Sequence, residues 1–280
     1  MRSAPFFSFL CALLLASASA VAGVVAEVPF EFRDGFILVK VQAPRARLTF
    51  LVDSGAGRTV VDLRTARRLK LPLGRPQPVQ GVNAEAVAFA TTGFAASLGG
   101  VPLNPDLLAI DLRNANELCG PIDGLIGIDF FAGRVVQIDY ATQHLRILDR
   151  APAPAEGVTL PLQAHNGVVC VPVAVDGSAR RWTRLDSGCN DALHWVESGK
   201  GSREEQQAVS IGFFTDPSKL VRCSVALGGQ TMPEVQTALH GREIFPGEAG
   251  LLGNGVLSRF ATMTIDLPKM CVVLTKRAGR

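Results

Sequence analysis

The sequence has little histidine, little tyrosine and only a small excess of positive charge. Its 280 residues include only 4 histidines and 1 tyrosine, and the net charge is +3. The basic residues between Arg64 and Lys70 have no aromatic residues among them, which is typical of the exposed face of a short helix rather than of a nucleic-acid site. No pair of cysteines and no group of histidines has the spacing of a zinc site. We therefore expect no nucleic-acid partner, no metal ion and no cofactor.

Long apolar runs are also missing, except at the N-terminus. Arg2 precedes an apolar run from about Phe6 to Leu15, and the small residues Ala18 and Ala20 follow. This order is typical of a secretory signal peptide. An uncleaved anchor is the alternative, but the run is marginal for a membrane span of ~20 residues. We expect residues 1–23 to be a signal peptide and the mature chain to be exported, periplasmic or secreted, with no further membrane contact.

The remaining composition is that of a globular protein. Apolar residues make up 48% of the chain and charged residues 19%, which allows a sizeable core. Export would permit disulfides among the cysteines that follow the signal, but the sequence cannot select a pairing. These cysteines are Cys119, Cys170, Cys189, Cys223 and Cys271.

One short motif occurs twice, as residues 53–55 and residues 186–188, and both copies read Asp-Ser-Gly. A single Asp-Ser-Gly is more often an ordinary turn. Here the surroundings repeat in order at a nearly constant offset, since 186 − 53 = 133 at the motif and 250 − 124 = 126 at a later Gly-ended segment. The repeat indicates a duplicated domain, with a first lobe at 24–150 and a second at 151–280 after a Pro-rich linker.

Short β-forming runs separated by turn signals predict a mostly β protein. Asp34-Gly35 and Asn166-Gly167 lie between such runs and predict hairpins. Asp62 is a good N-cap for a helix over 62–71, and the polar segment 76–93 predicts a mobile hairpin. We predict an all-β fold of two pseudo-twofold-related β-barrel lobes with a few short helices.

A pseudo-twofold pairing of the lobes would bring the two Asp-Ser-Gly turns face to face. Asp53 and Asp186 would then lie too close to ionise together, so the pair would share one proton. The ionised carboxylate could activate a water, while the protonated one donated to a substrate carbonyl. The hydroxyls of Ser54 and Ser187 would fix the geometry, and the turn glycines, Gly55 and Gly188, would allow close backbone approach.

These motifs resemble those of the pepsin-like and retropepsin-like aspartic proteases. The segment 53–56 with Thr59 is similar to the first catalytic turn of that family, and 186–188 is similar to the second. Segments 125–127 and 251–253 resemble the two hydrophobic residues and glycine that pack through each catalytic loop. The resemblance implies a dyad of Asp53 and Asp186 in a cleft between two β-barrel lobes, in an aspartic endopeptidase that hydrolyses peptides or unfolded proteins. We expect a monomer.

The sequence also departs from the family pattern. Gly57 replaces a residue type that is usual after the first turn. Cys189 and Arg184 replace residue types that are usual on either side of the second turn, which makes the second site the less certain one. The family's flap tyrosine is missing, because the only tyrosine, Tyr140, lies elsewhere. A flap is instead predicted around residues 81–87, with Asn83 and Glu85 near its tip.

Three alternatives remain open. The chain could be a catalytically inactive relative that binds extended peptides or a partner protein, which an ion pair between Arg184 and Asp186 would favour. A homodimer that uses Asp53 twice is less favoured, because the second lobe should block the contact. Cys189 with His194 would suit a thiol nucleophile and its base, but a disulfide or a buried thiol is the simpler interpretation.

Overall fold

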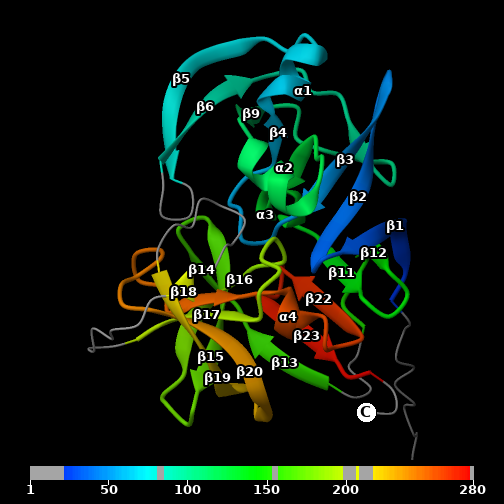
Figure 1. The fold of residues 1–280 in the computed structure, drawn as a ribbon. Coiled ribbons are helices and arrows are strands. Elements are labelled where there is room, and N and C mark those ends of the chain that lie inside the picture. The colour runs from blue at the N-terminus through cyan, green and yellow to red at the C-terminus, as the bar shows by residue number, and fades with distance from the viewer. Residues whose placement is uncertain (1–21, 81–84, 153–156, 198–205, 208–216, 278–280) are drawn as a thin grey trace, which may run out of the picture.

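The computed structural model describes residues 22–80, 85–152, 157–197, 206–207 and 217–277 (Figure 1). Strands hold 53% of the residues and helices 9%, so the prediction of a mostly β protein is confirmed. Among the predicted features, residues 1–21 of the signal, Asn83 of the flap, and most of the linker lie outside the described residues. No helix in the described part of the chain is long and apolar enough to cross a membrane.

The first half of the chain begins with a hairpin and includes a closed six-stranded barrel. The hairpin turns at Asp34 and Gly35, whose φ angles of 50° and 86° are the positive values that a tight two-residue turn requires. The strands of this half are β1 (Val24–Arg33), β2 (Phe36–Ala43), β3 (Ala46–Val52), β4 (Val60–Asp62), β5 (Leu73–Gln80), β6 (Glu85–Thr91), β7 (Ser97–Leu98), β8 (Val101–Pro102), β9 (Leu107–Ile110), β10 (Gly124–Ile126), β11 (Val135–Asp139) and β12 (His144–Leu148).

The second half repeats the strand pairings of the first. Strand β10 runs parallel to β3 and antiparallel to β4, and β21 runs in the same way between β16 and β17. The described strands of this half are β13 (Gly157–Pro161), β14 (Gln163–His165), β15 (Val168–Val175), β16 (Arg181–Leu185), β17 (Leu193–Val196), β18 (Gln206–Gln207), β19 (Pro217–Leu227), β20 (Gln230–His240), β21 (Gly250–Leu252), β22 (Thr262–Asp266) and β23 (Cys271–Thr275).

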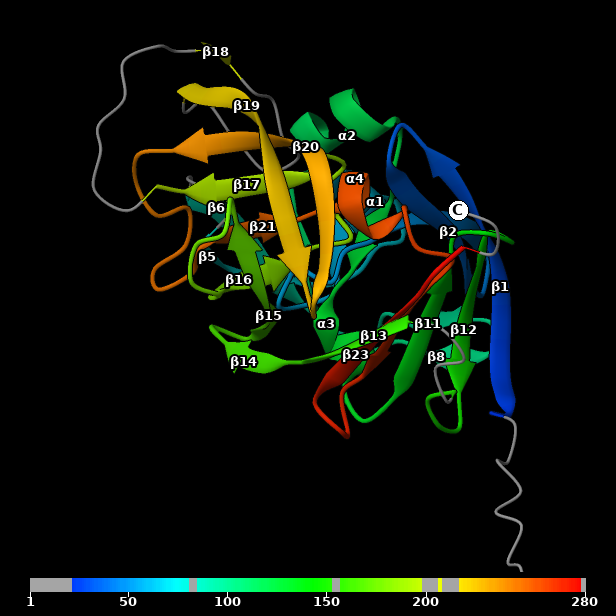
Figure 2. The same cartoon turned by 90° about the horizontal axis from the view of Figure 1, so that it is seen from below.

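A large open sheet joins the two halves. Its strand order is β13-β23-β22-β11-β12-β1, and Figure 2 shows β13, β23, β11, β12 and β1 in succession. At its centre β11 pairs antiparallel with β22, so that Gln137 lies opposite Thr264. The Gln137 amide donates to the buried Thr264 hydroxyl at 3.0 Å. The two halves of the chain are thus held together by backbone pairing as well as by the core.

Four short helices complete the described fold: α1 (Leu63–Arg68), α2 (Arg113–Cys119), α3 (Ile128–Phe131) and α4 (Asn254–Leu257). Asp62 caps α1, because its carboxylate accepts from the Arg64 and Thr65 amides. The Pro- and Gly-containing segment after α1 forms the β5–β6 hairpin that the sequence predicts. Helix α2 was not predicted. Among the described residues, Cys119, Cys170, Cys223 and Cys271 are free thiols, so none of these four forms a disulfide.

Candidate active site

The two Asp-Ser-Gly turns leave the ends of equivalent strands. Asp53 follows β3, and its amide donates to the Ile126 carbonyl at 2.9 Å. Asp186 follows β16, and its amide donates to the Leu252 carbonyl at 3.0 Å. Each Gly-ended apolar segment therefore fixes the point at which one aspartate leaves its strand. The structure thus brings together the predicted pair from positions 133 residues apart in the chain (186 − 53).

The two serines link the turns in a reciprocal cross. The Ser54 hydroxyl donates to the Leu185 carbonyl at 2.7 Å and accepts from the Ser187 amide at 3.0 Å. In the same way the Ser187 hydroxyl donates to the Val52 carbonyl at 2.9 Å and accepts from the Ser54 amide at 3.0 Å. Both serines are fully buried. These four hydrogen bonds hold the backbones that carry the aspartates in a fixed relation.

The glycine of each turn makes room for the aspartate of the other. A Cβ atom added to Gly55 would collide with the Asp186 carboxyl group, and one added to Gly188 would collide with that of Asp53. The Gly55 amide also donates to Asp53 Oδ1 at 3.0 Å, and the Gly188 amide donates to Asp186 Oδ1 at 2.9 Å. Glycine is therefore required at both positions by the close approach of the carboxyl groups.

The carboxyl groups of Asp53 and Asp186 hydrogen bond to each other, and burial raises the pKa of both. The negative charge of Asp186 and the hydrogen bond with it raise the pKa of Asp53 further. For Asp186, the positive charge of Arg184 and the Gly188 amide oppose the effect of burial on its pKa. Because both pKa values are raised and the two carboxyl groups are hydrogen bonded, we infer that the pair shares one proton.

Arg184 does not form its ion pair with Asp186. Its guanidinium donates to both carboxylate oxygens of Glu248, at 2.7 Å and 2.6 Å, and to the Gly55 carbonyl at 3.0 Å. The guanidinium carbon lies 3.4 Å from the centre of the Phe245 ring. Arg184 and Glu248 are both buried. The ion pair with Asp186 that would have favoured the inactive alternative is thus absent, and the cation is held beside the turns.

Glu248 and Asp129 are two residues of the site that belong to none of the motifs predicted from the sequence. Asp129 accepts from the Thr59 amide and hydroxyl at 2.8 Å and 2.6 Å, and the Thr59 hydroxyl accepts from the Gly127 amide at 3.1 Å. The first turn is therefore fastened to α3 behind it. The position of Asp129 two residues after a Gly-ended segment is a usable signal, whereas Glu248 follows an irregular Pro-Gly stretch that carries none.

The predicted flap is only partly described. Asn83 lies outside the described residues, and Glu85 begins β6, where it pairs with Gln80 of β5. The single tyrosine, Tyr140, is buried and donates through its hydroxyl to Asn254 Oδ1 at 2.8 Å. This hydrogen bond joins the two halves of the chain. Tyr140 therefore does not lie on a flap, as the sequence predicts.

The first turn lies within a segment that is similar to a known family. Residues 39–130 match the model of the aspartyl protease family. The matched segment is retropepsin-like; it contains Asp53 and the segment 125–127 but not Asp186. An aspartyl protease domain indicates aspartic peptidase activity on peptide substrates. No similar curated protein was found for the chain.

Proposed function

We propose that this protein is an aspartic endopeptidase in which Asp53 and Asp186 form one catalytic dyad between two pseudo-twofold-related lobes. The observation that carries the proposal is the reciprocal cross of Ser54 and Ser187, which holds two hydrogen-bonded carboxyl groups in place. The family match of residues 39–130 supports the same reaction class for the first turn. The order of the joining sheet supports two lobes, since β1, β12 and β11 mirror β13, β23 and β22.

The chemistry follows from the proton on the pair. The ionised Asp186 takes a proton from a water bound between the carboxyl groups, and the resulting hydroxide attacks the scissile carbonyl carbon. Asp53 donates its proton to the carbonyl oxygen, which gives a neutral tetrahedral diol. The proton now on Asp186 then passes to the amide nitrogen, the carbon–nitrogen bond breaks, and one diol hydroxyl returns its proton to Asp53. No covalent intermediate forms with the enzyme.

Cleavage of a denatured protein across acid to neutral pH tests this proposal. We expect Asp53→Asn and Asp186→Asn each to lower kcat/KM by at least about 10³-fold, because each removes one half of the acid–base pair. Asp106→Asn, which changes an exposed aspartate away from the turns, is the matched control and should keep full activity. Loss in Asp53→Asn alone would point to the first lobe acting by itself or as a dimer.

The inactive alternative has a distinct outcome. A folded parent chain that cleaves nothing at any pH but binds an extended peptide would identify a peptide-binding relative. We also propose export, on the basis of the N-terminal pattern of residues 2–20. N-terminal sequencing of the chain recovered from the periplasm or medium of a bacterial host should find the signal removed, and an intact Met1 would contradict cleavage.

A further inference from the structure

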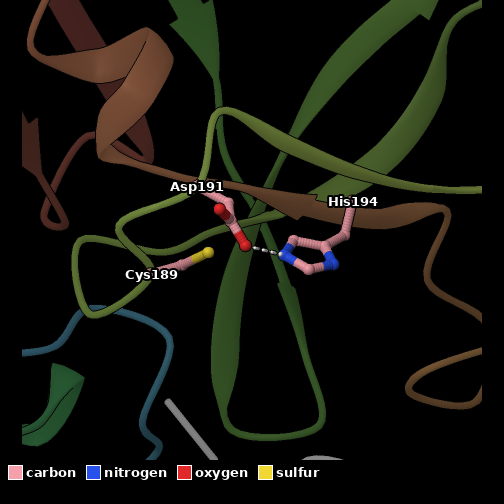
Figure 3. A group of neighbouring side chains, drawn as sticks. All are labelled: Cys189, Asp191 and His194. Carbon is pink, nitrogen blue, oxygen red and sulfur yellow. Dashed lines mark hydrogen bonds and ion pairs between the residues drawn. The ribbon is translucent and has the colours of Figure 1, made fainter. Parts of the chain in front are cut away.

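A group of metal-ligating side chains lies directly after the Asp186 turn. Cys189 and Asp191 lie on the loop after β16, and His194 lies on β17 (Figure 3). One ligand atom from each of the three lies within 4.8 Å of the others. Thiolate, carboxylate and imidazole are the protein ligands of zinc. We propose that these residues bind a divalent metal ion of the zinc class, which fastens the Asp186 turn to β17.

The three side chains are close to the separations that such an ion needs. Bonds of about 2.0–2.3 Å to a tetrahedral zinc ion place neighbouring ligand atoms about 3.3–3.6 Å apart. His194 Nε2 and Asp191 Oδ2 lie 2.9 Å apart, and the Cys189 thiol points toward the same carboxylate (Figure 3). Small rotations of Cys189 and Asp191 would admit the ion. Three protein ligands leave the fourth position for water.

Burial and charge also suit a cation at this place. Cys189 and His194 are buried, while the Asp191 side chain is 40% exposed and gives an ion access from solvent. A thiolate and a carboxylate supply two negative charges, which a divalent ion neutralises. A divalent ion would also offset the cost of a thiolate at the buried Cys189.

The backbone holds the ligands in place without the ion. The Cys189 carbonyl accepts from the Asn254 amide at 2.8 Å, and the Asp191 carbonyl accepts from the Gly255 amide at 3.0 Å. Both bonds attach the loop to the start of α4. Gly253 leaves the space beside the thiol, since a Cβ there would lie 3.0 Å from Cys189 Sγ. The site is therefore preorganised on two rigid attachments, α4 and β17.

His240 is hydrogen bonded to the ring nitrogen of His194 that does not face Asp191. His194 Nδ1 and His240 Nε2 are 2.9 Å apart, and the two rings stack with their centres 5.2 Å apart. With a metal ion on His194 Nε2, the proton lies on Nδ1 and is donated to His240, which fixes the tautomer and the ring. His240 is thus a positioning residue. Because both ring nitrogens of His194 already have partners, the arrangement does not favour a thiol nucleophile with His194 as its base.

The metal site does not depend on the proposed proteolysis. It is joined to the dyad turn through the backbone, where the Cys189 amide donates to the Asp186 carbonyl at 3.3 Å. An ion would tie this turn to β17 whether or not the turn catalyses a reaction. Zinc binding can therefore be measured in a chain that shows no activity.

Titration of the full chain with Zn²⁺ and Co²⁺, after treatment with a chelator and its removal, tests the proposal. We expect one ion per chain, an absorption band for charge transfer from thiolate to Co²⁺, and a rise in Tm with Zn²⁺. Cys189→Ser and Asp191→Asn should each weaken zinc binding by at least about 10-fold, and Cys189→Ser should remove the cobalt band. Cys223→Ser, which changes another buried thiol of the second half, is the control and should bind as the parent does.

Ligands and supporting residues should respond differently to replacement. Replacing the fully buried His194 risks unfolding, so the partly exposed Asp191 provides the decisive ligand variant. His240→Gln should keep the cobalt band and weaken binding by about 10–100-fold, as loss of a supporting hydrogen bond does. Zinc affinity unchanged in both Cys189→Ser and Asp191→Asn, or no zinc binding by the parent at micromolar concentrations, would overturn the proposal. Loss of binding in Asp53→Asn alone would also overturn it, because the ion would then lie in the dyad.

Discussion

The cation Arg184 gives Asp53 and Asp186 different electrostatic surroundings, although the two turns have the same sequence. Arg184 lies two residues before Asp186, where the first half has Leu51 at the equivalent place before Asp53. Glu248 and the Gly55 carbonyl hold its guanidinium in a fixed position. The positive charge lowers the pKa of Asp186 against the effect of burial. Within the pair, Arg184 therefore favours the ionised form of Asp186, which is the form that the proposed mechanism uses as the base.

Removing this cation should narrow the active pH range from the acidic side. Activity requires an ionised Asp186, and without Arg184 the pKa of Asp186 rises, so the acidic limb of the kcat/KM profile moves to higher pH. Arg184→Met with Glu248→Gln is the suitable change, because removing Arg184 alone would leave a buried unpaired charge that costs about 3–5 kcal/mol. The measurement is kcat/KM against pH in parent and double variant.

A matched pair controls for the loss of charge. Arg222→Met with Glu234→Gln removes an exposed ion pair of 3.9 Å in the same half and should leave the pH profile unchanged. If the acidic limb stays in place in the Arg184 variant, or moves to lower pH, Arg184 does not set the charge state of Asp186.

At the scale of elements, Asp62 joins two helices that are separate in the sequence. Its Oδ1 caps α1, and its Oδ2 accepts from the Leu112 amide at 3.1 Å at the start of α2. Asp62→Ala should lower the free energy of unfolding by about 2 kcal/mol, because it removes a cap and leaves a buried amide without its acceptor. Denaturant unfolding gives this value. Asp106→Ala, at an exposed loop position, should change the free energy of unfolding by less than about 0.5 kcal/mol. An equal change in both variants would show that the hydrogen bonds of Asp62 to α1 and α2 do not stabilise the protein.

The contrast between helices α1 and α2 shows how far the sequence can predict the structure. The α1 cap and the hairpin turn at Asp34-Gly35 were predictable, because each depends on residues within one short segment. The two Asp-Ser-Gly turns were predictable because the motif and its surroundings repeat in the sequence. Helix α2 was not predictable, since its N-cap residue, Leu112, makes no side-chain capping bond and its amide is instead bound by the distant Asp62. Glu248 was not predictable for the same reason, because its role depends on its ion pair with Arg184, which lies 64 positions away (248 − 184).

At the scale of the whole molecule, the joining sheet depends on both halves equally. Five residues of β11 pair with five of β22, and β12 and β1 extend the sheet on one side as β23 and β13 extend it on the other. The serine cross and the bond from Asn254 Nδ2 to the Gly35 carbonyl, at 2.7 Å, add side-chain links between the halves. These contacts do not require a continuous chain between Pro152 and Gly157.

A chain cut between its halves should therefore remain assembled and active. We would insert a recognition site for a specific protease between residues 152 and 157 and cleave the folded protein there. The halves should co-elute as a one-to-one complex, because the β11–β22 ladder and the shared core stay intact, and kcat/KM should remain within about threefold of the uncut value. Gln137→Arg, which places a charge opposite Thr264 in the buried ladder, should weaken the cut complex. If the halves of the cut parent protein, with Gln137 in place, separate, then the linker rather than the joining sheet keeps Asp53 and Asp186 together.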